Sequence, residues 1–365
     1  MRELRQAVVA LLLLSSVAVA ATAATVGSAL TQFDQSVRHY NLISFGSASF
    51  QQYGDTEGGL AIGGNLYLDG GTIAAQPGKF ALTSDPTLYV AGRLTVNDTA
   101  KLQSGYAAIS AAANAGWSWD GQQNRLSAGQ TVLSTVNTPD LRGDTDPRLN
   151  TGPDNWNFSS LRSDLIGVSQ TLGAASANGL IVIDSQNLRF KAANANTHGA
   201  IVFDLDANLL VGNTYAGQMF SNVQFDVPEG DAFVVNVRNA AGRTLFGAGN
   251  FNSGTGYDRL LWNIVDRTPS TDETVRFGNG GQFYGAVLAP TWNVANDFGT
   301  AINGQVVADS FTDRGAELHF TGFNFHEEFD SEVPEPGTYG LVGAAACVGI
   351  VLVHRRRRRG PAVLG

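Results

Sequence analysis

The stretch "LAIGGNLYL", Leu60 to Leu68, recurs 28 positions later as "LYVAGRLTV", Leu88 to Val96. Both copies place apolar residues at alternate positions and keep a glycine in the middle, Gly64 in the first and Gly92 in the second. Alternating apolar residues are typical of a strand with one buried side, and glycine permits a sharp change of direction. The repeat therefore predicts two copies of one strand–corner–strand unit.

Two further repeats have similar lengths. "GLIVID" from Gly179 recurs as "GAIVFD" from Gly199, at an offset of 20, and "GAVLA" from Gly285 recurs as "GQVVA" from Gly304, at an offset of 19. Such periods are typical of solenoids, in which each coil covers its apolar side by stacking on the next coil. We expect a mainly β fold built as a parallel β-helix or solenoid. An antiparallel β-sandwich, which also uses short strands and tight turns, is the alternative.

One segment between the repeats has helical rather than strand periodicity. "NFSSLRSDLIGVSQTLGAAS" places apolar residues three and four positions apart, with Asn157 as a candidate N-terminal cap: Phe158, Leu161, Leu165, Val168 and Leu172. A second helix is expected within residues 100–116. We interpret residues 99–177 as a helical excursion that places a helix along the flank of the solenoid.

The composition indicates a globular acidic protein. Hydrophobic residues make up 43% of the chain and the net charge is −9, although seven of the 23 basic residues lie in the two terminal segments. An acidic body repels phosphate backbones, so nucleic acid is not an expected partner. The single cysteine, Cys347, lies in a C-terminal apolar run. The body therefore has no thiol for a disulfide, a zinc site or thiol catalysis.

The N-terminus has the features of a secretory signal peptide, which we assign to residues 1–24. Arg2 and Arg5 precede an apolar run and a series of small residues. Cleavage is expected after Ala20 or Ala23, because small residues precede both positions. The sequence therefore predicts an exported protein.

The C-terminus predicts a membrane anchor with a recognition motif before it. A linker over 330–338 contains Val333, Pro334, Glu335 and Pro336; an apolar helix over 339–354 follows, and the tail 355–365 begins with Arg355, Arg356, Arg357, Arg358 and Arg359. The arginines are expected on the cytoplasmic side. This order of elements resembles a PEP-CTERM sorting signal. The resemblance implies processing by an exosortase, transient anchoring in the inner membrane, and delivery to the cell surface or extracellular matrix.

The body, residues 25–329, resembles the choice-of-anchor A domain. The likeness rests on "YGDTEGGLAIGGNLYL" near its start, with Glu57, Gly58, Gly63, Gly64 and Asn65, and on "GQFYGAVLAPTWNV" and "GTAINGQVVADSFTDRGAELHFTGFNF" near its end. The resemblance implies a β-helix with an adhesive, non-catalytic role. Exopolysaccharide, or glycans or proteins of a host or neighbouring surface, would then be its partners. The last coils also resemble ice-binding solenoids, but ice binding calls for flat rows of exposed threonine and the threonines here are scattered.

Candidate reactive groups are few. No G-x-S-x-G, H-E-x-x-H or P-loop motif occurs, and the spacing of His319, His326, Glu327 and Glu328 matches no familiar zinc site. Asp204 and Asp206 face the same side of a strand, and the repeat places Asp184 one coil earlier, in register with Asp204. Stacked carboxylates there would serve calcium binding or a polysaccharide lyase or hydrolase. We expect no other cofactor. Five tryptophans either pack in the core, which is the more common position for such side chains, or form an exposed platform for sugars: Trp117, Trp119, Trp156, Trp262 and Trp292.

Overall fold

The repeat that begins at Leu60 and Leu88 forms neighbouring coils of a parallel β-solenoid. Strands β3 (Gly59–Ile62) and β6 (Leu88–Val90) pair in parallel, with Leu60 opposite Leu88. Beyond the glycine corner, β4 (Leu66–Leu68) and β7 (Leu94–Val96) pair in the same way, with Leu66 opposite Leu94. The predicted strands and their register are confirmed, and the offset of 28 is the length of one coil.

The computed structural model describes residues 26–325 except 53, 77, 81–84, 111–115, 117, 121–124, 129–130, 136–156, 195–198, 227–230, 247–249, 252–255, 266–273, 279–280 and 298. Of 118–120, 125–126, 131–135 and 250 it describes the backbone alone. All described residues belong to one compact unit, which ends at Phe325. The expected signal peptide, sorting motif, membrane helix and arginine cluster lie outside the described residues.

Each complete coil supplies one strand to each of three faces. After β3 and β4 comes β5 (Thr72–Ile73), and after β6 and β7 comes β8 (Ala100–Leu102), which pairs in parallel with β5. The preceding coil has β1 (Tyr40–Ser44), β2 (Ala48–Phe50) and an isolated bridge from Thr56 to Leu318. Inward side chains from all three faces form one continuous core.

The C-terminal repeat is confirmed in the same manner. Strands β26 (Ala286–Asn296) and β28 (Val306–Asp313) pair in parallel with Val287 opposite Val306, and each turns a corner within its length. The third strands of these two coils are β27 (Ala301–Asn303) and β29 (Leu318–His319), which pair in parallel. β27 also pairs with β25 (Gln282–Tyr284), the third strand of the coil before them.

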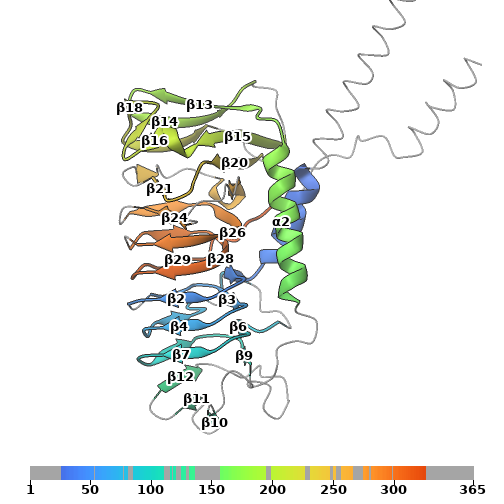
Figure 1. The fold of residues 1–365 in the computed structure, drawn as a ribbon, viewed down its shortest axis with the longest axis vertical. Coiled ribbons are helices and arrows are strands. Elements are labelled where there is room, and N and C mark those ends of the chain that lie inside the picture. Colours follow the sequence, from blue (N-terminus) through green and yellow to red (C-terminus); the bar gives the residue numbers. More distant parts are fainter. Residues whose placement is uncertain are drawn as a thin grey trace, which may run out of the picture. The chain divides into compact units, whose positions relative to one another are not determined.

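The order of strands shows that the chain enters the solenoid in its middle. The longest path of the 14-stranded sheet is β15 (Ala200–Asp206), β20 (Ala232–Arg238), β23 (Leu260–Ile264), β26, β28, β1, β3, β6 and β9 (Ala107–Ile109). From β1 the chain winds to one end, crosses to the other, and winds back until β28 closes on β1, with Leu42 opposite Val306 (Figure 1). Every pairing in this sheet is parallel, so the antiparallel sandwich is wrong.

Two helices cover one face of the coils, which we call the helix-covered face. They are residues 26–37 and α2 (Phe158–Ala174), which lies along the stacked strands (Figure 1). The predicted cap is confirmed, since the Asn157 side chain accepts a hydrogen bond from the Ser160 amide. Strands of this face are buried on both sides: Leu42 points into the coil, whereas Ile43 packs in the cluster that contains Leu165 of α2.

The remaining elements are short. They comprise β10 (Ser118–Asp120), β11 (Arg125–Ala128), β12 (Thr131–Thr135), β13 (Gly179–Asp184), β14 (Asn187–Ala192), η2 (Ala207–Leu209), β16 (Leu210–Val211), β17 (Thr214–Tyr215), β18 (Gln218–Met219), β19 (Asn222–Asp226), β21 (Thr244–Leu245), β22 (Asn250–Phe251), η3 (Tyr257–Arg259) and β24 (Thr274–Phe277).

Two sequence-based expectations are wrong. The helix expected within 100–116 is replaced by β8 and β9, because Ala100 and Leu102 alternate with the exposed Lys101 and point into the core. The excursion therefore begins later than residue 99. The "GLIVID" repeat does not form a coil equivalent to β15, because β13 turns back at Ser185 and pairs antiparallel with β14.

Candidate binding surface

Two faces of the solenoid are left uncovered by the helices. We call the first the long open face; it consists of β21, β24, β2, β4, β7 and the second parts of β26 (293–296) and β28 (310–313). The second, the short open face, consists of β25, β27, β29, the bridge at Thr56, β5 and β8. On these two faces the outward side chains of the strands are open to contact with another molecule.

The long open face presents one outward side chain from each of seven successive strands. These residues are directly opposite one another in the order Thr244, Arg276, Ala295, Thr312, Ser49, Tyr67 and Thr95. Neighbouring strands are ~4.8 Å apart, so the row is a regular array. Around Tyr67 the side chains on either side, Leu66 and Leu68, point into the core.

The chemistry of this row, which we call the outward row, is polar and nearly neutral. Thr312, Ser49 and Thr95 offer hydroxyl groups, and Tyr67 adds a ring and a phenol. Arg276 is paired, because its Nε lies 3.3 Å from an Asp297 carboxylate oxygen. Beside the row, the Ser310 hydroxyl donates to the Asn293 amide oxygen over 2.7 Å. The face is therefore suited to many weak hydrogen bonds with an extended polar ligand.

The short open face carries a connected polar network centred on His319. The Tyr284 hydroxyl donates to the Gln282 amide oxygen over 2.5 Å, and the Asn303 amide nitrogen lies 3.4 Å from the same oxygen. His319 Nδ1 lies 2.9 Å from Asn303 Oδ1, and His319 Nε2 lies 2.7 Å from Glu317 Oε2. Both ring nitrogens of His319 therefore have hydrogen-bond partners. The network fixes these side chains in place.

The first family motif lies at the seam between the N-terminal and C-terminal coils. The Glu57 carboxylate accepts a hydrogen bond from the Phe320 amide at 2.7 Å and pairs with Lys79 at 2.6 Å. The Gly58 amide donates to the side chain of Asn41, whose amide nitrogen donates to the Gly304 and His319 carbonyls at 3.1 Å. These residues therefore hold together segments that are far apart in the sequence.

The second family motif forms a corner between two faces. The Gly64 amide donates to the Gly46 carbonyl at 2.8 Å, and the Gly92 amide donates to the Gly64 carbonyl at 2.9 Å. A Cβ on Gly64 would lie 2.6 Å from the backbone of Gly46, so only glycine fits this stack. The Asn65 side chain accepts from the Arg93 amide at 2.8 Å. Gly63 directly precedes this stack, and its amide donates to the Ser44 carbonyl at 2.7 Å.

The three aspartates considered for calcium or catalysis do not converge. Asp184 lies at the end of β13 and pairs with Arg189 at 2.6 Å, whereas Asp204 pairs with Arg238 at 3.2 Å. Asp206 caps η2 through the Asn208 amide and accepts from the Asn239 side chain. The predicted register of Asp184 with Asp204 is wrong, because β13 pairs with β14. Across the described part of the chain, no three His, Cys, Asp or Glu side chains are grouped as metal ligands.

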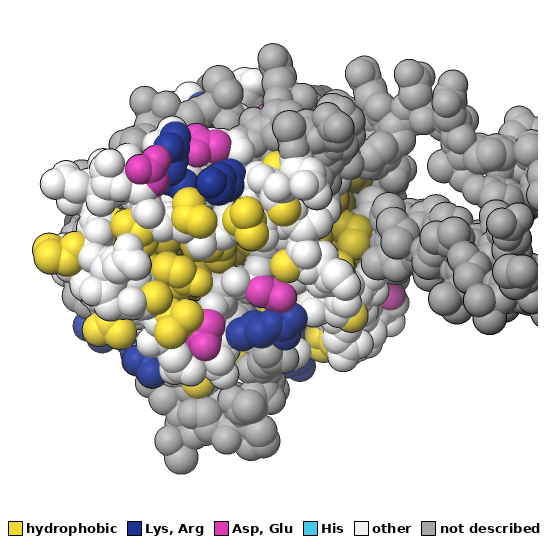
Figure 2. All heavy atoms as spheres, turned by 90° about the horizontal axis from the view of Figure 1, so that it is seen from above, with side chains coloured by type: hydrophobic (Ala, Val, Ile, Leu, Met, Phe, Trp, Pro, Cys, Tyr) yellow, Lys and Arg dark blue, Asp and Glu magenta, His cyan; other side chains and the backbone are white. Residues whose placement is uncertain are grey.

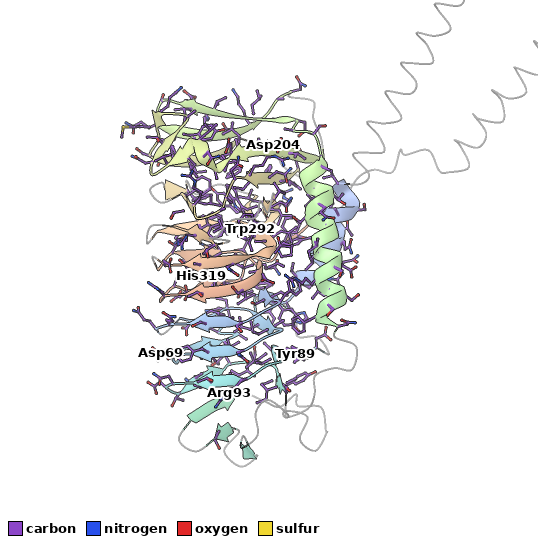
Figure 3. All side chains as sticks on the ribbon, in the orientation of Figure 1. Asp69, Tyr89, Arg93, Asp204, Trp292 and His319 are labelled. Carbon is purple, nitrogen blue, oxygen red and sulfur yellow. The ribbon has the colours of Figure 1, made fainter. Side chains whose placement is uncertain are left out.

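Trp262, Trp292 and His39 are buried, whereas His319 is partly exposed. Trp262 and Trp292 are core residues, and Trp292 lies among the coils in Figure 3. Neither can form a sugar platform; the side chains of Trp117, Trp119 and Trp156 lie outside the described set. Burial lowers the pKa of His39 below its usual 6.5, and the charge of Asp85 opposes that shift. His198, His326 and His354 lie outside the described residues.

The outward row was missed by sequence reasoning, although a signal was present. Tyr67 and Thr95 are the polar positions between the apolar pairs of the first repeat. Aligning the repeat already places them side by side on the outside of neighbouring coils. Residues such as Thr312 and Ser49 could not be added, because nothing in the repeat shows that β28 lies beside β2.

Comparison with known proteins gives a family. The model of a family described as "Putative Ice-binding-like adhesive domain" matches residues 33–320. The chain belongs to this family. Its membership agrees with the sequence resemblance to an adhesive domain and supports a surface-binding rather than an enzymatic class of protein. No match was found among curated proteins.

Several solved structures are similar to this one. An ice-binding protein from Arctic yeast shares 11% identity and a TM-score of 0.32, over 78% of this chain and 91% of that one. An ice-binding protein from an Antarctic biological consortium shares 13% identity and a TM-score of 0.32, over 80% and 93%. A domain of an ice-binding protein from Shewanella frigidimarina shares 11% identity and a TM-score of 0.33, over 78% and 95%. In the described part of this chain, neither helix has the length and apolarity needed to span a membrane.

Proposed function

We propose that this protein is a non-catalytic adhesin that binds polysaccharide through its long open face. The observation that carries the proposal is the outward row, in which seven strands each present one side chain in register: four hydroxyl residues, Arg276, Ala295 and Tyr67. A rigid array matches a ligand that itself repeats, such as a glycan chain. The Tyr67 ring can stack on a sugar, and the hydroxyls on either side can exchange hydrogen bonds with it.

Binding by such a face depends on the number of contacts rather than on one pocket. Each hydroxyl contributes little, because it exchanges a hydrogen bond with water for one with the ligand. Rigidity compensates in part, since the parallel coils hold the side chains in place before the ligand arrives. Display of many copies on one surface would raise the avidity further.

The export route is part of the proposal. We infer that the signal peptide directs export and that an exosortase recognises Val333 to Pro336 and removes the apolar helix and Arg355 to Arg359. The acidic, cysteine-free body is compatible with life outside the cell. Mass spectrometry of the mature C-terminus tests this route: a C-terminus near Pro336 is expected, and an intact arginine cluster on the released protein would contradict it.

The alternative function, a polysaccharide lyase or hydrolase, is not supported by the arrangement of the aspartates. A lyase or hydrolase built on Asp184, Asp204 and Asp206 needs these carboxylates around one substrate, and each has its own partner instead. Ice binding also fits the outward row poorly, because Tyr67 and Arg276 interrupt the hydroxyl groups.

The deciding experiment measures binding and turnover together. The full chain is applied to a glycan array and to exopolysaccharide from the producing cell, and released sugars are quantified. Retention without product is expected, and an Asp204→Asn variant should be retained equally. Product formation that disappears in Asp204→Asn would refute the adhesin.

A further inference from the structure

One end of the solenoid is closed by the hairpin of β13 and β14. The two strands are joined by a two-residue turn at Ser185 and Gln186, with Ser185 at a φ of 57°. Ile181 and Ile183 face inward and pack against the core. This hairpin takes the position of a final coil and covers the end of the core.

The outer surface of this end is apolar, unlike the rest of the described surface. The exposed large hydrophobic residues of the described chain are all here, at 41–68% exposure: Leu180 on β13, Leu209 in η2, Val211 on β16 and Met219 on β18. Figure 2 shows apolar side chains gathered on this end, with groups of basic and acidic side chains at their margins. Terminal repeats of solenoids normally present a polar outer surface, so an apolar one indicates an interface.

β13 is also an edge strand without the usual protection. It is the last strand of its four-stranded sheet and, among the described residues, pairs only with β14. Edge strands are commonly blocked by charges, proline or bulges, but Gly179 to Ile183 contains neither a charge nor a proline. The two-residue turn is flanked by the hydrogen-bonded pair Asp184 and Asn187, and hydrogen-bonded pairs occur at every second position along the hairpin. The backbone N–H and C=O groups of Ile181 and Ile183 therefore point away from β14, toward the open edge.

The strand that best fits this edge is a second copy of β13. In an antiparallel pair centred on Val182, Ile181 of each copy is opposite Ile183 of the other, so the open backbone groups of both are satisfied. The side chains of Val182 then meet at the two-fold axis. Leu180 is opposite Asp184 of the other copy, so no like charges face each other directly.

The charges beside the edge also favour this pairing. Lys191 lies opposite Leu180 within the hairpin and has no ion-pair partner among the described residues. In the dimer, Asp184 of the other copy would lie two strands away, about 10 Å between backbones, which a lysine side chain can span. Arg189 already neutralises Asp226, at 2.7 Å, as well as contacting Asp184, so Asp184 can accept a second cation.

We propose that two copies of this protein associate end to end through antiparallel pairing of their β13 strands. The contact is isologous, so it closes at two copies and forms no fibre. The dimer doubles the number of outward rows on one particle and leaves both long open faces free.

Cysteine cross-linking tests the pairing and its register. All variants carry Cys347→Ser, which removes the only cysteine of the chain. Val182→Cys should form a disulfide-linked dimer on mild oxidation, because position 182 meets itself across the axis. Leu180→Cys alone should not, because its two copies would be ~14 Å apart along the strands. Mixing Leu180→Cys with Asp184→Cys should restore the cross-link.

A second measurement keeps the proposal falsifiable if oxidation fails. The full chain with Val182→Lys should sediment as a monomer where the wild type is a dimer, because two lysines would face each other at the axis. Lys101→Ala, on the short open face, should leave the dimer intact. A monomeric wild type, or equal cross-linking of all single cysteine variants, would overturn the proposal.

Discussion

Asp313 is a buried carboxyl at the corner between the two open faces, and its ionisation costs stability. Burial raises the pKa of Asp313 to about 6, although amide hydrogen bonds from Ala316, Gly315 and Arg314 and the side chain of Asn296 act against the shift. The native state therefore holds this proton up to a higher pH than the unfolded chain, whose pKa is near 3.8. The contribution of protonated Asp313 to the free energy of unfolding is complete below pH 3.8 and is lost as the pH rises through 6.

Asp313→Asn should remove this pH dependence. The difference between a pKa of 3.8 in the unfolded chain and about 6 in the native state corresponds to about 3 kcal/mol. The wild type loses this free energy of unfolding between about pH 3.5 and pH 7, whereas the variant does not, so the variant should become more stable relative to wild type by about that amount. Urea unfolding at several pH values measures it. A difference that does not change with pH would show that the buried carboxyl is not the cause.

The corner glycines carry the second residue-scale prediction. Gly64→Ala places a Cβ 2.6 Å from the Gly46 backbone, which cannot move without separating two coils. The free energy of unfolding should fall by about 1–3 kcal/mol or more. Gly78→Ala is the matched control, because its Cβ would meet nothing within 4 Å, and it should unfold like the wild type. Equal stability of both variants in urea would contradict the stacked corner.

At the scale of elements, α2 contains two glycines with opposite surroundings. Gly167 is exposed in mid-helix and a Cβ there would meet nothing within 4 Å, whereas a Cβ on Gly173 would lie 2.7 Å from Val265. Gly167→Ala should raise the melting temperature, since alanine favours a helix by ~1 kcal/mol. Gly173→Ala should lower it. The reverse order would mean that α2 does not pack on the sheet at this register.

Elements with clear periodicity could be predicted from the sequence, and those that depend on partners could not. The helix stripe and the 28- and 19-residue repeats gave the correct elements, because their buried positions are fixed by local period. "GLIVID" resembles a coil strand equally well, but the turn at Ser185 makes it a hairpin. The position of α2 on the sheet depends on buried polar contacts. The Asn263 side chain donates to the Ser169 carbonyl of α2 at 2.9 Å and to the Asn236 side chain of the neighbouring strand at 2.8 Å. Nothing in the sequence marks these asparagines as partners of a helix.

At the scale of the whole molecule, closure of β28 on β1 decides which surfaces exist. Repeats indicate that sequential coils are neighbours, but they do not indicate that the first coil lies beside the last. Through that closure, Thr312 and Ser49 become adjacent and the outward row becomes continuous. The family motifs could be recognised in the sequence, whereas their role in the seam required the positions of Phe320 and Asn41.

The most direct test of the account compares polysaccharide binding by variants of the two open faces. Full chain carrying Tyr67→Ala should bind exopolysaccharide at least about tenfold more weakly than wild type, because the aromatic ring of the row, between Ser49 and Thr95, is lost. Stacking of this kind is worth about 1.4 kcal/mol. Lys101→Ala, on the short open face, should bind like the wild type, and both variants should unfold at the wild-type temperature. Unchanged binding by Tyr67→Ala together with loss of binding by Lys101→Ala would contradict the assignment of the long open face.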